Sequence, residues 1–172
     1  MFSITYISDE DNFDSNFKIT RRIAVKGIIK KDGKILLINT NKGDYKFPGG
    51  GIKKNESIEQ ALKREIEEET GFKLKFIGKV LGKVFERRLD QYEPETIFEM
   101  ESIYILCDLD YKEVVKQKLD TYEAEQEFQP IFIALEDALE NNLQCLKNNK
   151  DINSWVRRET DVISKLIEMW EK

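Results

Sequence analysis

Residues 50–72 read GGIKKNESIEQALKREIEEETGF, and they decide both the fold and the chemistry expected of this chain. The stretch follows FPG at 47–49, so it begins as a glycine-rich turn whose backbone can approach a neighbouring group closely. Ser57 is a favourable N-cap, and Gln60 three residues later completes a capping-box pattern. Gly71 suits the position just after a helix, so the sequence predicts a helix between Ser57 and Gly71.

The carboxylates of this helix fall where a soluble helix normally places apolar side chains. On a wheel of about 100° per residue, the apolar face is formed by Ile58, Ala61, Leu62 and Ile66. Glu65 and Glu69 lie within that face, and Glu68 lies at its border. Inward carboxylates are costly unless a basic cluster or divalent cations neutralise them, and oxygen ligands suit Mg²⁺ or Mn²⁺. The alternative is a helix that bends toward the surface and leaves these acids solvated.

The stretch resembles the signature of the MutT-like Nudix hydrolases, G-x5-E-x7-R-E-U-x-E-E-x-G-U, where U is a bulky aliphatic or aromatic residue. Every fixed position is matched, by Gly50, Glu56, Arg64, Glu65, Ile66, Glu68, Glu69, Gly71 and Phe72. So many fixed positions at fixed spacing make the match far more specific than a lone glycine motif. The resemblance implies an α/β fold, the Nudix α/β/α sandwich, with a mixed β-sheet between helical layers.

The resemblance also implies a reaction, the Mg²⁺-dependent hydrolysis of the diphosphate linkage in a nucleoside diphosphate derivative. Water attacks phosphorus, and the substrate is a nucleoside triphosphate, ADP-ribose or a similar nucleotide. The metal ligands that it implies are Glu65, Glu68 and Glu69, with Glu56 and a carbonyl of Gly49 or Gly50 as further candidates. Mn²⁺ is the alternative ion. Because carboxylates alone would repel a diphosphate, a bound cation is needed to invert the field and to lower the pKa of a bound water.

Other residues are candidates for supporting roles. Arg64 is expected to orient a carboxylate of the signature, and many relatives take a further acid from a loop outside it. Glu125 is preferred for that role, with Glu123 and Glu127 as alternatives. The candidates for substrate binding are Gly50 and Gly51 in the turn and Arg87 and Arg88 near a strand end. Solvated surface charge is the alternative for at least one of these arginines.

The composition of the whole chain limits the classes of protein and of catalytic site that are possible. The chain has 172 residues, of which 35% are charged and 40% hydrophobic, as in a soluble globular protein, and no long apolar run suggests a membrane span. The net charge of −5 disfavours stable nucleic-acid binding. The absence of histidine excludes a histidine base and an imidazole-bound zinc. Cys107 and Cys145 have neither metal nor redox spacing, which favours a reduced, cytoplasmic setting.

The predicted elements form one domain, residues 1–172. It comprises an N-terminal strand and loop at 1–20, a core at 21–147 and a C-terminal helix at 150–172. Strands are expected at 2–7, 22–29, 34–39, 74–87, 96–107 and 131–135, and Asp32-Gly33 predicts a hairpin turn. Residues 111–129 are expected to be polar and partly helical, and further helices are expected at about 136–147 and 152–170. The last helix carries a stripe of Trp155, Val162, Leu166 and Met169, which predicts core packing.

Several alternatives stay open at this point. A non-catalytic nucleotide-binding domain would share the fold, although it is expected to lose a carboxylate of the signature. An isoprenoid diphosphate isomerase would need a proton donor, for which Cys107 is the only candidate. A glycosidase is set aside, because adjacent glutamates on one helical turn are too crowded to flank a glycosidic bond. Selectivity among nucleotides would come from loops and from aromatic residues such as Phe13, Phe17, Tyr45 and Tyr92, for which packing is the alternative. The nucleotide itself and the oligomeric state, with a homodimer as one possibility, are left undetermined.

Overall fold

The computed structural model describes residues 1–9, 12–148 and 151–171. Within these ranges four strands precede the first helix, and two helices end the chain. Its strands are β1 (Phe2–Ile7), β2 (Lys18–Lys31), β3 (Lys34–Asn39), β4 (Tyr45–Lys46), β5 (Phe72–Leu89), β6 (Thr96–Val114) and β7 (Gln129–Ile133). Its helices are α1 (Ile58–Thr70), α2 (Thr121–Glu125), α3 (Leu135–Asn148) and α4 (Val156–Trp170).

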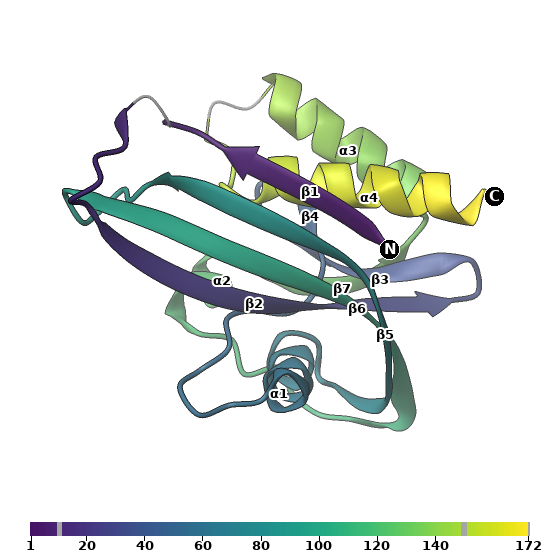
Figure 1. Ribbon diagram of the computed structural model, residues 1–172. Helices are drawn as coiled ribbons and strands as arrows, with labels where there is room; N and C mark the ends of the chain where they lie inside the picture. Colours follow the sequence, from purple (N-terminus) through teal and green to yellow (C-terminus); the bar gives the residue numbers. More distant parts are fainter. Residues whose placement is uncertain (10–11, 149–150, 172) are drawn as a thin grey trace.

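The strands form one mixed sheet between two helical layers. Its order is β1-β5-β6-β2-β3-β4, and β7 pairs with β3. Pairing is parallel between β1 and β5 and between β2 and β6, whereas β5 and β6 are antiparallel. Helix α1 lies on one face of the sheet, and α3 and α4 lie together on the other (Figure 1). The expected sandwich of a mixed sheet between helical layers is confirmed.

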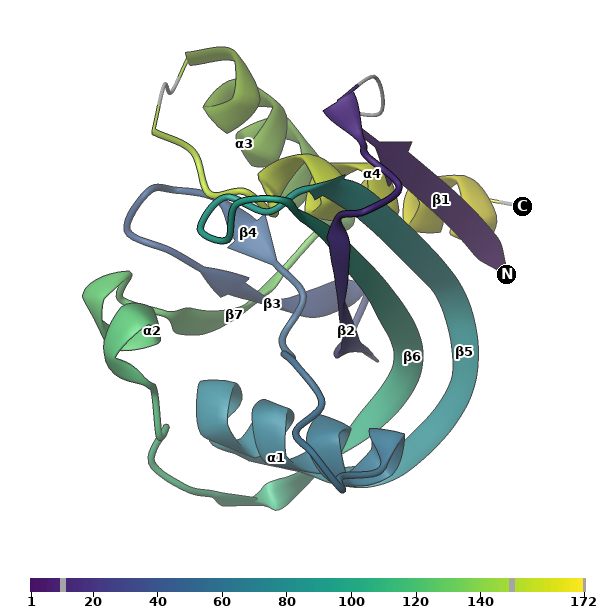
Figure 2. The same ribbon diagram turned by 60° about the vertical axis from the view of Figure 1, so that its left-hand side comes forward.

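The central strands are apolar on both faces because both faces are covered. Ile28 and Tyr104 pack into the cluster beneath α3 and α4, whereas Ile29, Ile103 and Ile105 pack into the cluster beneath α1. Neighbouring residues in a strand point to opposite faces, so each strand supplies both clusters. Figure 2 shows β5 and β6 curving around toward α1, so that the long strands wrap the helix that carries the acidic signature.

The local predictions around α1 are confirmed. The Ser57 hydroxyl accepts a hydrogen bond from the backbone of Gln60, and the Gln60 side chain accepts one from the backbone of Ser57. Gly71 ends the helix at φ 75°, a left-handed conformation that glycine adopts without strain. The hairpin between β2 and β3 turns at Asp32 and Gly33, both at positive φ, as a primed turn requires.

Other boundaries differ from the predictions. Strands β5 and β6 extend beyond 74–87 and 96–107, and β6 takes in the first residues of the segment expected to be loop-like. The last helix begins at Val156, and Trp155 is its N-cap. Val162 and Leu166 are buried as predicted, but Trp155 faces the cleft described below. The break expected at 148–151 falls partly outside the described residues.

Two buried side chains of the helical layer fix the chain that leads into the glycine turn. The amide of Asn142 in α3 accepts from the Tyr45 backbone N–H (2.8 Å) and donates to the Tyr45 carbonyl (3.0 Å), as a neighbouring strand would. A carboxylate oxygen of Glu159 in α4 accepts from the Phe47 backbone N–H at 2.9 Å. The helices that follow β7 therefore help to shape the approach to the glycine turn at 48–51. No helix in the described part of the chain is long and apolar enough to cross a membrane.

Candidate active site

The glycine turn brings backbone and carboxylates into close contact. Gly49 has φ 130°, and a Cβ there would lie 2.1 Å from the carbonyl oxygen of Val25. A Cβ on Gly50 would lie 2.5 Å from a carboxylate oxygen of Glu65. Both positions therefore require glycine, the first for its backbone conformation and the second to admit the carboxylate.

Glu69 is the most enclosed acid of the signature, with 1% of its surface exposed. One of its oxygens accepts from the Gly49 backbone N–H at 2.7 Å, and the other lies 2.6 Å from the ammonium of Lys46. The ammonium of Lys26 binds the carbonyl of Gly49. Burial, together with the nearby charge of Lys46, lowers the pKa of Lys26 to about 8. The buried acids thus lie beside two buried lysines that the sequence analysis did not select.

Arg64 holds the outer acids of the signature, as expected of an orienting residue. Its guanidinium binds both oxygens of Glu56, at 2.7 and 2.8 Å, and it also contacts Glu65, Glu68 (3.1 Å) and the carbonyl of Gly51 (3.1 Å). Arg64, together with the backbone N–H of Lys53, lowers the pKa of Glu56 to about 2. Both oxygens of Glu56 are therefore already occupied by donors of the protein.

Three carboxylates converge on one point. Glu65, Glu69 and Glu123 each offer an oxygen, and these oxygens lie within 4.8 Å of one another. Burial raises the pKa of Glu65 and also that of Glu123. Glu65 and Glu69 come from successive turns of α1, whereas Glu123 comes from α2 across the cleft. We call these three residues the acid cluster.

The structure changes the order of preference among the acids outside the signature. Glu123, kept in the sequence analysis as an alternative, is the one that lies with Glu65 and Glu69. Glu125, the preferred residue, is exposed at the end of α2, and Glu127 is exposed at φ 53° just beyond it. Counting back from β7 could not identify which acid lies with Glu65 and Glu69, because α2 turns successive side chains in different directions.

A cleft of about 410 Å³ opens over the acid cluster. Its lining comes from the glycine turn, α1, α2, the exposed face of β2, β5 and β6, and the segment before α4. It includes Arg22, Lys26, Lys46, Gly49, Gly50, Gly51, Glu65, Glu69, Arg88, Phe98, Met100, Tyr122, Glu123, Ser154, Trp155 and Arg158. An adjoining hollow of about 370 Å³ is lined by Arg64 and Glu68 and also by Arg22, Glu65 and Glu123. The cleft and the adjoining hollow therefore meet at Glu65 and Glu123, which line both.

The candidate substrate-binding residues separate into two groups. Gly50, Gly51 and Arg88 line the cleft. Arg87 does not line it; its guanidinium lies 3.5 Å from Glu99 and over the ring of Phe13. The two arginines differ because adjacent residues of β5 point to opposite faces of the sheet. Arg22 was missed by sequence reasoning, although it is exposed at the mouth of the cleft.

The aromatic residues of the cleft also differ from the candidates Phe13, Phe17, Tyr45 and Tyr92. Tyr45 is buried in the core, and Tyr92 is 88% exposed on a loop. Tyr122 and Trp155 line the cleft instead, with ring centroids 5.9 Å apart.

Cys107, the donor considered for an isomerase, is buried in the cluster beneath α1, where burial raises its pKa to about 12.

The acid cluster suits a hard divalent cation. All of its donor atoms are carboxylate oxygens, which Mg²⁺ and Mn²⁺ prefer, and it includes neither cysteine nor histidine. The three residues lie at the base of a cleft rather than on an open surface. Glu68, outside the acid cluster, is bound by Arg64. The carbonyl of Gly49 accepts from Lys26, and the carbonyl of Gly50 accepts from the backbone N–H of Val25.

Comparisons with known proteins identify the family of this chain. A family model described as the NUDIX domain matches residues 19–157. An ADP-ribose pyrophosphatase of Methanocaldococcus jannaschii is 53% identical over 53 residues, which cover 28% of this chain and 31% of that protein. A nucleoside triphosphatase of Escherichia fergusonii, NudI, is 34% identical over 96 residues, which cover 51% of this chain and 67% of that protein.

A solved structure extends the agreement to most of the fold. The MutT NUDIX hydrolase from Burkholderia pseudomallei matches with a TM-score of 0.52 and 21% identity, over 83% of this chain and 97% of that one. Likeness at that identity shows the fold alone, and it confirms the expected architecture. The chain spans less than half the length of three of the curated relatives that it matches.

Proposed function

The chain belongs to the NUDIX family, and on that premise we propose that it hydrolyses the diphosphate linkage of a nucleoside diphosphate derivative with the help of Mg²⁺ or Mn²⁺. The observation that carries the proposal is the convergence of the Glu65, Glu69 and Glu123 oxygens within 4.8 Å at the base of the cleft. The relatives named above act on ADP-ribose and on nucleoside triphosphates, both of which contain a nucleoside diphosphate.

The acids of α1 are proposed to hold the cation. Glu65 and Glu69 are its direct ligands, Glu123 faces them from across the cleft, and Glu68 lies in reach through the adjoining hollow. When bound, the cation supplies positive charge to the phosphate oxygens and acidity to a nearby water. Glu56 is proposed to act through Arg64, because both of its oxygens are already bound by that guanidinium.

The positively charged residues of the cleft are proposed to receive the substrate. Arg22 and Arg88 lie at its mouth, where each guanidinium can donate to phosphate oxygens. Lys46 lies at its base, beside Glu69 and the rings of Phe128 and Trp155. Its ammonium neutralises Glu69 and lines the space that the diphosphate would enter.

Proton transfer is assigned to a glutamate because the chain contains no histidine. Glu123 fits this role, since burial raises the pKa of its carboxyl and a more basic carboxylate accepts a proton more readily near neutral pH. Its carboxylate also accepts a hydrogen bond from the Asp120 backbone N–H at 2.9 Å, which fixes its direction. We assign Glu123 as the base that takes a proton from the attacking water.

A matched pair of variants in α2 tests the assignment. Glu123→Gln keeps the acceptor for the Asp120 N–H but removes the base, whereas Glu125→Gln changes an exposed acid two residues away. Release of phosphate-containing products would be followed for a panel of nucleotides with Mg²⁺ and with chelator. We expect metal-dependent turnover that falls by about 10²- to 10⁴-fold in Glu123→Gln and stays unchanged in Glu125→Gln.

Two outcomes of the same experiment would count against the proposal. Equal losses in the two variants would remove Glu123 from the mechanism. Tight nucleotide binding in the presence of Mg²⁺, with no turnover of any compound, would favour a nucleotide-binding domain that does not catalyse hydrolysis.

A further inference from the structure

Asp44 is a buried acid that the proposed function does not use. It lies in the turn between β3 and β4, outside the acid cluster, and 1% of its surface is exposed. None of the ion pairs found among the described residues includes it. A buried carboxylate is costly unless hydrogen bonds satisfy it, so the neutral partners of Asp44 are held close to it.

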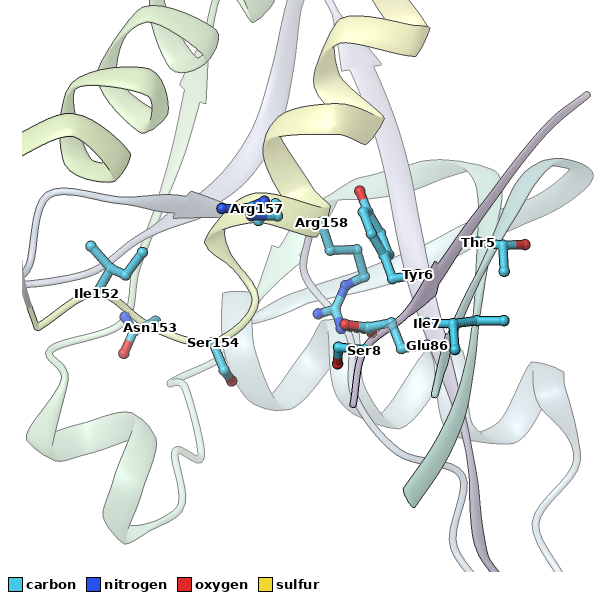
Figure 3. A pocket seen from close by; sticks show the side chains of 10 residues that line it. All are labelled: Thr5, Tyr6, Ile7, Ser8, Glu86, Ile152, Asn153, Ser154, Arg157 and Arg158. Carbon is cyan, nitrogen blue, oxygen red and sulfur yellow. Dashed lines mark hydrogen bonds and ion pairs between the residues drawn. The ribbon is translucent and has the colours of Figure 1, made fainter. Parts of the chain in front are cut away.

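The carboxylate of Asp44 joins the turn after β3 to the segment that leads into α4. One oxygen accepts from the Thr40 hydroxyl at 2.5 Å and from the Asn153 amide at 2.9 Å. The other oxygen accepts from the indole N–H of Trp155 at 2.8 Å. Figure 3 shows Asn153 on this segment, where it lines a neighbouring pocket, whereas Trp155 lines the cleft. The oxygen that binds the indole is therefore the one that acts on the site.

Trp155 occupies a position at the start of α4 that its side chain does not stabilise. It is the N-cap of the helix, where Ser, Thr, Asp or Asn usually binds a free backbone N–H, and its side chain makes no such bond. The indole has a single N–H, which donates to Asp44, so this hydrogen bond fixes how the ring is turned. A residue that departs from the local preference is expected where it serves a site.

The Trp155 ring also contacts the lysine at the base of the cleft. The ammonium of Lys46 lies 5.7 Å from the centroid of the Trp155 ring and 4.3 Å from that of the Phe128 ring. The same ammonium lies 2.6 Å from a carboxylate oxygen of Glu69. Aromatic rings attract an ammonium that lies within about 6 Å of their centroid. A Trp155 ring that turned away would therefore leave Lys46 less well fixed and would open the wall of the cleft.

We propose that Asp44 is a positioning residue of the site, which fixes the Trp155 ring as a wall of the cleft and thereby keeps Lys46 directed toward the space that a diphosphate would enter. It acts through the indole N–H. Its loss is expected to weaken nucleotide binding more than it slows the chemical step, because the partners of Glu65 and Glu69 do not include Asp44. This inference rests on the proposed function, because it takes the cleft as the place where the nucleotide binds.

Steady-state kinetics on ADP-ribose test the proposal. Asp44→Ala removes the acceptor of the indole N–H and Asp44→Asn keeps an acceptor, while Thr40→Val is a matched control that removes a donor to the other oxygen. In Asp44→Ala we expect KM to rise about tenfold and kcat to change by less than about twofold, and Asp44→Asn should stay close to the wild type. Thr40→Val should lower the melting temperature without changing KM. An unchanged KM in Asp44→Ala, or the same rise in Thr40→Val, would overturn the proposal.

A double-mutant cycle with Trp155→Phe, which lacks the N–H, tests the route through the indole. Asp44→Ala should raise KM in the wild-type background but add no further rise in the Trp155→Phe background. Additive effects on KM would show that Asp44 acts independently of the indole and would overturn the proposal. If Asp44→Ala does not fold, Trp155→Phe alone decides, because its KM should also rise about tenfold and an unchanged KM would overturn the proposal.

Tryptophan fluorescence separates this inference from the proposed function. Because the chain contains two tryptophans, Trp170→Phe leaves Trp155 as the single emitter. In that background Asp44→Ala should shift the emission of Trp155 to longer wavelength and lower its anisotropy, while Thr40→Val should change neither. This result without hydrolysis of any nucleotide would contradict the proposed function but support the positioning of Trp155. Hydrolysis of nucleotides together with an unchanged Trp155 signal in Asp44→Ala would do the reverse.

Discussion

Two groups of buried and half-buried charged residues, both in the part of the chain that the structure describes, differ in what satisfies them. In the first, the acid cluster, the three carboxylates converge at the base of a cleft. In the second, Glu159 accepts from the Phe47 N–H (2.9 Å), the Tyr104 hydroxyl (3.0 Å) and Arg158 (3.0 Å), and Arg158 also binds Glu86. We call this second group the Glu159 network.

The difference shows which buried acids are available to a ligand. Burial alone would raise the pKa of Glu159, but Arg158 and then Lys26 hold it below its usual value. The donors to Glu159 all belong to the protein, so this acid stabilises the fold. In the acid cluster, burial raises the pKa of Glu65 and that of Glu123, although Arg64 acts in the opposite sense on the first and Lys46 on the second. The burial of a single acid is therefore a weaker sign of a functional site than the convergence of several carboxylates at an open cleft.

The largest effect is expected from Glu69→Gln. The amide keeps an acceptor for the Gly49 N–H, but it loses the negative charge that a cation requires. Turnover should fall by about 10²- to 10⁴-fold, while the circular dichroism spectrum stays that of the wild type. Calorimetric titration with Mn²⁺ should show weaker binding. Undiminished Mn²⁺ affinity would mean that this acid is structural, like Glu159.

The next effect should come from Glu159→Ala. It leaves Arg158, the Tyr104 hydroxyl and the Phe47 N–H without their common partner, so the free energy of unfolding should fall by about 3–5 kcal/mol. Urea denaturation measures this loss. The control is Glu168→Ala on the same helix, whose exposed pair with Lys165 should contribute less than about 1 kcal/mol. If the two variants lost equal stability, the Glu159 network would not be the structural centre described here.

Lys46→Met should have a smaller effect that depends on the cation. Without metal, Glu69 loses the ammonium 2.6 Å away, and the free energy of unfolding should fall by about 1–3 kcal/mol. Saturating Mg²⁺ should restore part of that stability, because the cation replaces the missing charge. Thermal melts with Mg²⁺ and with chelator measure the difference, and Lys46→Arg is the control that keeps the charge. A loss of stability that Mg²⁺ leaves unchanged would contradict this account of Lys46.

The smallest effect concerns Glu56, the half-buried partner of Arg64. Its pKa falls from 4.5 to about 2 in the folded protein, so between these values the unfolded chain binds more protons and stability rises with pH. The contribution of Glu56 is therefore present above pH 4.5 and lost as the pH falls toward 2. Wild type and Glu56→Gln should differ in urea midpoint at pH 6 and converge at acid pH. A constant difference between the two midpoints would show that the pair with Arg64 does not depend on charge.

The sequence predicted the parts of the site that follow from local order along one helix. The position of Glu65 and Glu69 on the inner face of α1, the caps at Ser57 and Gly71, and the orienting contacts of Arg64 all depend on residues close in sequence. Helical periodicity and capping rules connect these residues without any knowledge of the fold.

The parts that were missed depend on contacts between distant segments. Lys46 lies on a strand and meets Glu69 only when the sheet packs against α1, and Lys26 reaches the Gly49 carbonyl from another strand of that sheet. Trp155 was expected in the apolar stripe of the last helix. In the structure that helix begins one residue later, and the Trp155 ring lies in the cleft. The sequence did contain one sign of a buried lysine. Lys26 lies within an apolar run, where a charged residue needs a partner.

The pairing between Asn142 and Tyr45 has a consequence for self-association. Strand β4 ends the sheet on one side, and an unpaired edge strand can recruit a strand from another molecule. The Asn142 amide already binds the N–H and the carbonyl of Tyr45, so an incoming strand would first have to displace it. A single side chain from α3 thus occupies the backbone groups of Tyr45 that a strand from another molecule would need.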